Sequence, residues 1–498
     1  MRRRLIEGEN CMHYFVSSRE DPQTSAIEIA QARRQKLFDF LGADSQIVEI
    51  ERNDFSVEAQ GNLGTRNRVI NIYRFFQGQI VPKSLKRGMQ NLVPVNSRAG
   101  KTPYIYLYQG KKILEFHLHH NRLFYADNYD QYGFLQQRVF FLQNNVNYIE
   151  KYDSQANLTE RDFPDEFGDS VVSEFYCQST DNQPMLTQIK VKYAGCIYVF
   201  NNYDEFYAFF FDCLVELDPQ AVFYCDRESV ILKGMTLMQH SAPRFAVIHS
   251  AIYYDDQKTL YPVFEPLGKL VKLGKLTGII CATKQEQQDI MAEYDISQVY
   301  ALPVTYVKPI KAPLSYKAGN LIAVARTDGV KNLRAMVMSV ILLKRKYPNL
   351  TLNIYGNVTD KKAAKELDKI IKKRHAESYI HYGEFSKQID QVYQTAELNL
   401  LTSHDEGFAM ALVEAQANGC ACLSYDIKYG PREIIKDGVS GKLTKPNWID
   451  FMHQLDYLLS HPSIIEQYKL NALKQANKYS FENVAQAWST FLKVNKLE

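Results

Sequence analysis

Two glutamates with a fixed spacing are the residues of this chain best suited to bind a polar ligand. Glu406 and Glu414 lie eight positions apart in the run EGFAMALVE. Eight residues are slightly more than two helical turns, so a helix through this run would carry both carboxylates on one face, roughly 12 Å apart. They could then accept hydrogen bonds from the two ends of a sugar nucleotide, one a hexose and one a ribose. Gly407 and the free amides of the first turn would favour the phosphates between them.

Two cations precede the glutamates in the same part of the chain. Arg326 ends an apolar run at 320–325, and Lys331 follows five residues later. If the run is a strand, both cations lie near its carboxyl end, where they could hold a diphosphate and stabilise its charge as it leaves. Taken alone, each pair is more often a solvated surface feature. Their weight comes from occurring together with Glu406 and Glu414 in one α/β segment.

The periodicity of the chain divides it into segments that could position these residues. Apolar strand-length runs alternate with helical periods in 12–75, 202–308 and 309–480, which predicts parallel sheets covered by helices. Short aromatic-rich runs between turn residues predict an inserted antiparallel β-meander at 76–201. We expect an α/β fold with two Rossmann-like domains facing a cleft. A last helix at 481–498 is expected to pack back toward the N-terminal domain.

Composition excludes several classes of protein. A net charge of +3 is too small to argue for nucleic-acid binding. The eight cysteines show no C-x-x-C spacing, which favours reduced thiols in a cytoplasmic protein. The most apolar segment, 206–217, is too short and too charged to span a bilayer. Basic clusters such as 369–374 are more often solvated helix faces, but they could meet a polyanion or a lipid surface at the inner face of the membrane.

Neither a metal site nor a cofactor site is expected. The chain contains no D-x-D motif and no His/Cys/Asp cluster with metal-ligand spacing. Metal-dependent sugar transfer is therefore not expected. Cationic side chains would have to do the work of a divalent ion.

A series of motifs resembles the nucleotide-binding half of retaining glycosyltransferases with the GT-B fold, glycosyltransferase family four. These motifs are VARTDGVKN at 324–332, LNIYG at 352–356, GEF at 383–385 and EGFAMALVE at 406–414. The run SYDIKYGPREIIKDGVSG at 424–441 is most similar to bacterial poly(glycerol-phosphate) α-glucosyltransferases of wall teichoic acid. It also resembles the catalytic subunits that O-glycosylate serine-rich adhesins. The resemblance extends from Met12 to the C-terminus.

The resemblance implies roles for individual residues. Arg326, Lys331, Glu406 and His249 form the implied catalytic set, in which the two cations bind the diphosphate, and Glu406 and His249 reach the transferred sugar. Asp226 is the implied acceptor-side contact. The implied donor-binding set is Thr24, Ser25, Ala26, Ile27, Glu384, Phe385, Glu406, Gly407, Phe408, Ala409 and Glu414, with Glu384 and Phe385 beside the uracil and Glu414 on the ribose.

Two positions depart from the family pattern. Relatives carry glycine where this chain has Ala26, and commonly where it has Ala409. If either position needs a positive φ, alanine would strain the backbone there.

The activity implied by the resemblance is retaining transfer of glucose or N-acetylglucosamine from a UDP-sugar to a cell-surface hydroxyl. A poly(glycerol- or ribitol-phosphate) teichoic acid is the favoured acceptor. One alternative is O-glycosylation of Ser or Thr in a serine-rich adhesin, together with a partner subunit. A second is a non-catalytic substrate-binding subunit. The meander at 76–201 would set the acceptor and could mediate self-association, because its edges need covering.

Overall fold

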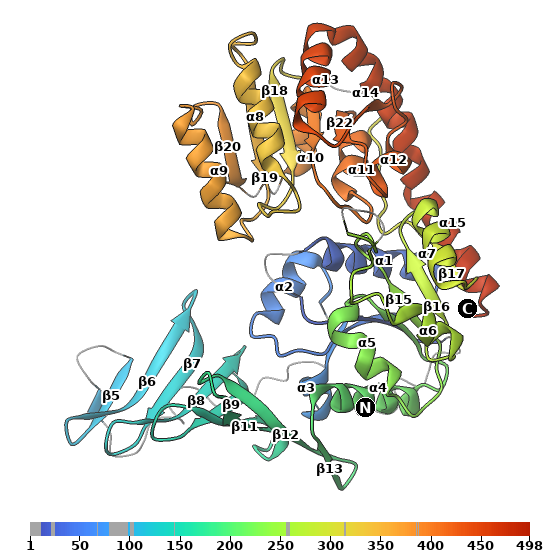
Figure 1. Ribbon diagram of the computed structural model, residues 1–498. Helices are drawn as coiled ribbons and strands as arrows, with labels where there is room; N and C mark the ends of the chain where they lie inside the picture. Colours follow the sequence, from blue (N-terminus) through green and yellow to red (C-terminus); the bar gives the residue numbers. More distant parts are fainter. Residues whose placement is uncertain are drawn as a thin grey trace. The chain divides into compact units, whose positions relative to one another are not determined.

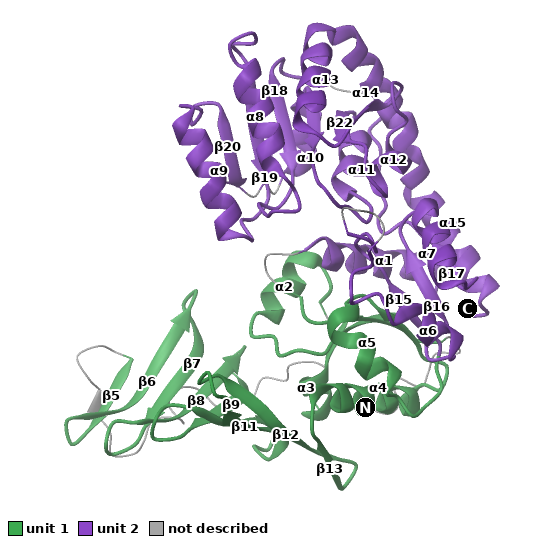
Figure 2. Ribbon diagram, in the orientation of Figure 1, with its two compact units in different colours: residues 1–24, 45–242 green, residues 25–44, 243–498 purple. Residues whose placement is uncertain are grey.

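The computed structural model describes most of the chain as two compact units. One unit comprises residues 1–24 and 45–242, and the other comprises 25–44 and 243–498 (Figure 2). The described residues are 11–20, 25–66, 68–78, 98–99, 104–143, 145–254, 259–312, 315–384, 386 and 388–498. The domain boundaries expected at 76, 201, 309 and 481 remain predictions.

The first unit contains parallel strands that are buried along their whole length. They lie in the order β14 (Val222–Cys225), β1 (His13–Ser17), β2 (Ser45–Glu49) and β3 (Val69–Asn71). Every residue of β1 and β14 is buried, as expected for a sheet covered on both faces. The helices of this part are α2 (Ser56–Leu63), α3 (Ile72–Phe76), α4 (Tyr203–Leu217) and α5 (Glu228–Thr236).

The same unit contains the predicted antiparallel meander, which is confirmed. Its strands form one ten-stranded sheet in chain order (Figure 1). They are β4 (Arg98–Ala99), β5 (Ile105–Tyr108), β6 (Lys111–His119), β7 (Arg122–Tyr129), β8 (Leu135–Leu142), β9 (Asn145–Tyr152), β10 (Leu158–Pro164), β11 (Ser170–Gln178), β12 (Pro184–Tyr193) and β13 (Cys196–Phe200).

Aspartates close three of the hairpins of this sheet in the same way. Asp153 Oδ1 accepts hydrogen bonds from the backbone amides two and four residues later, at 2.8 and 2.9 Å. Asp130 and Asp165 repeat the arrangement. An aspartate that binds the amides following it stabilises a tight turn, so local sequence sets where these strands reverse.

A buried charge network joins neighbouring strands of the meander. Arg161 on β10 lies 2.7 Å from Glu150 on β9 and 2.9 Å from Glu174 on β11. The Glu174 side chain is 0% exposed. Tyr73 of α3 donates a hydrogen bond to Glu174 at 2.6 Å. The network therefore holds the sheet to the helical part of its own unit.

Replacing Arg161 with methionine should destabilise this sheet, because the buried Glu174 carboxylate would lose its cation. We expect a cost of about 3 kcal/mol, which corresponds to roughly a hundredfold faster amide hydrogen exchange in β10 and β11. Lys233→Met is the matched control, because it breaks an ion pair whose lysine is 74% exposed. Equal exchange rates in the two variants would contradict the assignment.

The second unit begins with one helix and a group of three parallel strands. Its helix α1 (Ala26–Leu41) starts at a capping box formed by Ser25 and Glu28 and ends at Gly42 in the left-handed conformation. The strands lie in the order β17 (Val299–Ala301), β16 (Gly278–Cys281) and β15 (Arg244–Val247). The helices in this stretch are α6 (Leu267–Lys272) and α7 (Lys284–Tyr294).

A six-stranded parallel sheet completes the second unit. Its order is β20 (Ile380–Glu384), β19 (Thr351–Tyr355), β18 (Asn320–Val324), β21 (Leu398–Leu401), β22 (Ala421–Tyr425) and β23 (Gly441–Thr444). The remaining helices are α8 (Leu333–Leu343), α9 (Lys361–Lys373), α10 (Ile389–Thr395), α11 (Met410–Ala417), α12 (Gly430–Ile434), α13 (Trp448–Ser460), α14 (Pro462–Ala476), η2 (Asn477–Tyr479) and α15 (Phe481–Val494).

Alternate residues of the central strand face two separate cores. Leu321 and Ala323 of β18 join a cluster with apolar residues of α8, α9 and α13. Ile322, between them, joins another cluster with residues of α10, α11 and α12. This is the side-chain alternation of a strand that is buried on both faces. The expected α/β class with parallel sheets is confirmed.

Candidate active site

The two glutamates that define the candidate site do not share a helix. Helix α11 begins at Met410, so Glu406 lies in the loop that precedes it. The prediction of one helix through both residues is therefore wrong. The physical reason is Ala409, whose φ of 67° and ψ of 60° are left-handed and turn the chain before the helix starts. The backbone of Glu406 instead accepts a hydrogen bond from the Tyr429 amide at 2.9 Å.

The structure brings Glu406 and Lys331 into direct contact. Lys331 Nζ donates to Glu406 Oε1 at 2.6 Å, and Ser403 Oγ donates to the same oxygen at 2.7 Å. The Lys331 and Glu406 side chains are 19% and 11% exposed. A charge-assisted hydrogen bond this well shielded fixes both groups in place. It ties the loop after β18 to the loop after β21.

Arg326 lies beside this pair along the chain and stays accessible. It follows β18, its side chain is 56% exposed, and its Nη2 lies 3.1 Å from Asp328 Oδ2. Asp328 Oδ1 also accepts a hydrogen bond from the Lys331 amide at 3.0 Å. Asp328 therefore orients the segment that carries both cations. Sequence reasoning missed it, although an aspartate just before a helix start is a recognisable turn signal.

Close backbone approaches at two glycines shape this edge of the sheet. A Cβ on Gly356, at the end of β19, would lie 2.3 Å from the carbonyl oxygen of Ala325. A Cβ on Gly407 would lie 2.5 Å from the carbonyl oxygen of His249. Only glycine fits at these distances. The backbone of His249, just after β15, is thereby packed against the loop that carries Glu406.

Glu414 has a partner that the sequence did not indicate. Arg33 Nη1 on α1 donates to Glu414 Oε1 at 3.0 Å and also to Thr305 Oγ1. Burial raises the pKa of the Glu414 carboxyl above its usual value, and Arg33 opposes that rise. No local signal relates these residues, because they are 381 positions apart.

The other predicted donor-site residues lie on two further segments. Ser25 precedes α1, and its amide donates to Glu28 at 2.7 Å, while Ala26 and Ile27 form the first turn. Glu384 ends β20, where its carbonyl oxygen accepts a hydrogen bond from the Gly356 amide at 2.9 Å. Thr24 and Phe385 lie outside the described residues.

Asp226, the predicted acceptor-side residue, belongs to the first unit. It follows β14 and is 1% exposed, and its amide donates to the Val16 carbonyl oxygen at 3.0 Å. Phe408, in the loop with Glu406, is buried and packs edge to face against Tyr479. The ligand-binding roles of these residues remain predictions.

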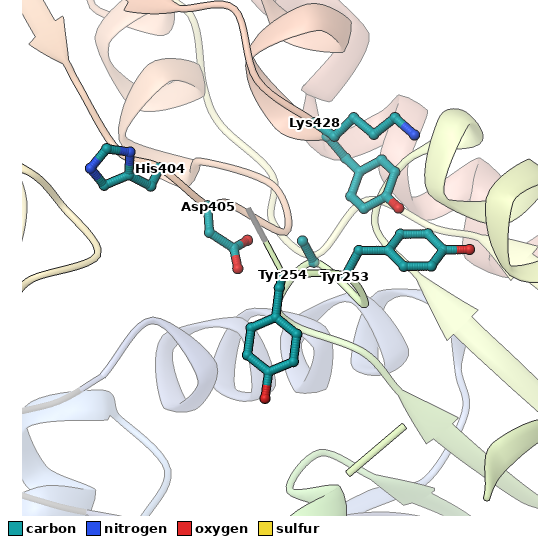
Figure 3. Close-up of a pocket in the computed structure, with 7 residues that line it drawn as sticks. Tyr253, Tyr254, His404, Asp405 and Lys428 are labelled. Carbon is teal, nitrogen blue, oxygen red and sulfur yellow. The ribbon is translucent and has the colours of Figure 1, made fainter. Parts of the chain in front are cut away.

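A small hollow lies next to the Glu406 loop. Tyr261 Oη donates to Asp405 Oδ2 at 3.0 Å, and Lys428 Nζ lies 2.8 Å from Asp289. The hydroxyl, imidazole, carboxylate and ammonium groups of its wall can hydrogen-bond a polyhydroxylated molecule. The lining residues are Ala251, Tyr253, Tyr254, His404, Asp405, Lys428 and Tyr429 (Figure 3).

Within the described ranges, no group of three or more His, Cys, Asp or Glu side chains is arranged to hold a metal ion. No helix among those same residues is long and apolar enough to cross a membrane.

Comparison with known proteins gives the family context of this geometry. Residues 310–478 match the family model described as "Glycosyl transferases group 1". The chain is 20% identical to the poly(ribitol-phosphate) alpha-N-acetylglucosaminyltransferase of Staphylococcus aureus, over 91% of both chains. It is 22% identical to the UDP-N-acetylglucosamine–peptide N-acetylglucosaminyltransferase GtfA subunit of Streptococcus parasanguinis, over 94% of this chain and 96% of that protein.

A solved structure supports the fold. The crystal structure of a S. aureus TarM mutant in complex with fondaparinux, alpha-GlcNAc-glycerol and UDP aligns with a TM-score of 0.81 at 18% identity. The alignment covers 96% of this chain and 99% of that one. The expected GT-B fold is confirmed. Residues 310–478 form a glycosyltransferase group 1 domain.

Replacing Ala409 with glycine should stabilise the protein. A left-handed conformation costs an alanine roughly 1–2 kcal/mol, and glycine avoids this cost. Part of the gain is lost, because glycine also increases the conformational entropy of the unfolded chain. We expect a net gain of about 0.5–1 kcal/mol in the free energy of unfolding, measured by chemical denaturation. Ala411→Gly, inside α11, is the matched control and should lose about as much. Destabilisation by both substitutions would contradict the left-handed assignment.

Proposed function

We propose that this chain, a glycosyltransferase with a group 1 domain at residues 310–478, transfers a hexose from a UDP-sugar to a hydroxyl group with retention of the α configuration. The observation that carries the proposal is the Lys331–Glu406 ion pair beside the exposed Arg326 at the carboxyl end of β18. Such an edge of a parallel sheet is where ligands of α/β proteins bind. The relatives named for UDP-N-acetylglucosamine support the choice of donor.

The cations would act on the leaving group. Arg326 and Lys331 would bind the diphosphate and stabilise the negative charge that develops as the bond between C1 and the phosphate oxygen breaks. Glu406 accepts hydrogen bonds from Lys331 and Ser403 on one oxygen, Oε1. A carboxylate has about four acceptor sites, so Glu406 keeps capacity for a hydroxyl of the transferred sugar.

The acceptor would react on the face from which UDP departs. Its hydroxyl oxygen forms the new bond to C1, and its proton passes to a phosphate oxygen of the departing UDP. Because the acceptor attacks from the face that UDP leaves, the α configuration is retained without a protein nucleophile. We include metal independence in the proposal, because the two cations supply the positive charge that a divalent ion supplies elsewhere.

A polyol-phosphate polymer is the first candidate acceptor. It is supported by the match to a poly(ribitol-phosphate) enzyme along 91% of both chains. The second candidate is a serine-rich protein modified together with a partner subunit, which the near full-length match to a GtfA subunit supports. A non-catalytic binding subunit is disfavoured, because Arg326, Lys331 and Glu406 are all present and Lys331 is ion-paired with Glu406.

A transfer assay with two donors and three acceptors tests the proposal. UDP-glucose and UDP-N-acetylglucosamine would each be offered with poly(glycerol-phosphate), poly(ribitol-phosphate) and a serine-rich peptide, with EDTA present. We expect one donor to be used with one of the polymers, and an α-linked product by NMR. Transfer to the peptide alone would move the assignment to the second acceptor. An EDTA-sensitive reaction or a β-linked product would refute the proposed mechanism.

The turnover rate should fall sharply when the charged groups of the site are removed. Arg326→Ala and Glu406→Gln should each lower kcat with the UDP-sugar by about a hundredfold or more, on the scale of lost transition-state contacts. Arg345→Ala is the matched control, because Arg345 is an exposed cation on the same unit after α8. Near-normal turnover in the Arg326 and Glu406 variants, with circular dichroism unchanged, would refute the assignment.

A further inference from the structure

Three segments that are far apart in the chain meet at the side chain of Arg33. Arg33 lies on α1, Thr305 follows β17, and Glu414 lies on α11. Arg33 Nη1 donates to both of the other residues, with 3.0 Å to Glu414 Oε1. The Arg33 and Glu414 side chains are 29% and 19% exposed. The pair is thus shielded enough to be ordered and open enough to be reached by a ligand.

The charges around Glu414 make Arg33 important for its ionisation. Burial and the neighbouring Asp390 carboxylate both disfavour the charged form of Glu414, whereas Arg33 favours it. Burial, and after it the charge of Glu414, raises the pKa of the Tyr393 phenol on α10. The charge of Arg33 opposes the rise in the Glu414 pKa that burial causes.

The geometry of the contact leaves Glu414 able to bind a ligand. An ionised carboxylate only accepts hydrogen bonds and offers about four sites on two oxygens. The bond from Arg33 falls on one of them, Oε1. The hydrogen bond to Thr305 restrains the guanidinium, and the bond from the same nitrogen, Nη1, to Glu414 Oε1 restrains the carboxylate.

We propose that Arg33 is a positioning residue, which holds the Glu414 carboxylate charged and oriented to accept both hydroxyls of the ribose of a nucleoside diphosphate. This inference rests on the proposed function, in which Glu414 meets the ribose of UDP. It goes further by assigning the recognition of the ribose diol to three residues, Arg33, Thr305 and Glu414. α1 therefore contributes to nucleotide recognition through its second turn as well as through its start.

Binding of UDP and of 2′,3′-dideoxy-UDP, measured by calorimetry, tests this assignment. The dideoxy nucleotide lacks both ribose hydroxyls, so its affinity measures the contacts to the base and the diphosphate without those to the hydroxyls. Arg33→Met should weaken UDP binding about tenfold, the scale of a lost hydrogen bond to a charged group, and change dideoxy-UDP binding less than twofold. Arg33→Lys should restore part of the loss. Adding Arg33→Met to Glu414→Gln should cost nothing more, because the two residues act as one unit.

The outcomes separate this inference from the proposed function. If the wild-type protein binds neither nucleotide, the proposed function fails and the inference falls with it. If the wild type prefers UDP but Arg33→Met weakens both nucleotides equally, Arg33 is only structural and the inference is overturned while the function stands. Thr305→Val is the second variant should Arg33→Met not fold. It should give a smaller loss confined to UDP, and an equal loss for both nucleotides would overturn the inference.

Discussion

The ion pair between Lys331 and Glu406 is the interaction on which the candidate site depends. Neither charge could stay largely shielded from water without the other, because burying an isolated ammonium or carboxylate costs several kcal/mol. Each side chain therefore lowers the free-energy cost of burying the charge of the other. The two come from loops that follow β18 and β21, neighbours in the six-stranded sheet. One electrostatic contact thus links a predicted phosphate-binding loop to a predicted sugar-binding loop.

Close backbone contacts at two glycines also hold the loops of the candidate site in place. Gly356 and Gly407 let backbone segments approach within distances that no other residue allows. At Gly356 the end of β19 lies against the chain that leads into Arg326. At Gly407 the Glu406 loop lies against the backbone of His249. Backbone contacts therefore hold the loops at this edge of the sheet. These loops carry the charged side chains of the site.

The sequence predicted the elements better than the connections between them. Alternating apolar runs were sufficient for the parallel sheets and the antiparallel meander, because burial on one or both faces determines those patterns. The occurrence of Arg326, Lys331 and Glu406 in one α/β segment, together with the family resemblance, was sufficient to group these three residues. The expectation that Glu406 and Glu414 share one helical face failed because Ala409 is left-handed. Alanine is the strongest helix former, so only the glycine that relatives commonly carry at this position pointed to a positive φ. Arg33 could not be predicted, because only the tertiary fold brings it to Glu414.

The contact between Arg33 and Glu414 also constrains the order in which the protein can be completed. These residues are separated by 381 positions, and a ribosome adding 5–20 residues per second needs roughly 20–80 s to make such a stretch. During that time α1 has no partner on α11. The helix is suited to the delay, because polar side chains such as Glu28, Gln31 and Arg34 are among those it finally buries. Because part of the surface that α1 finally buries is polar, the helix exposes less apolar surface to water while α11 is still being made.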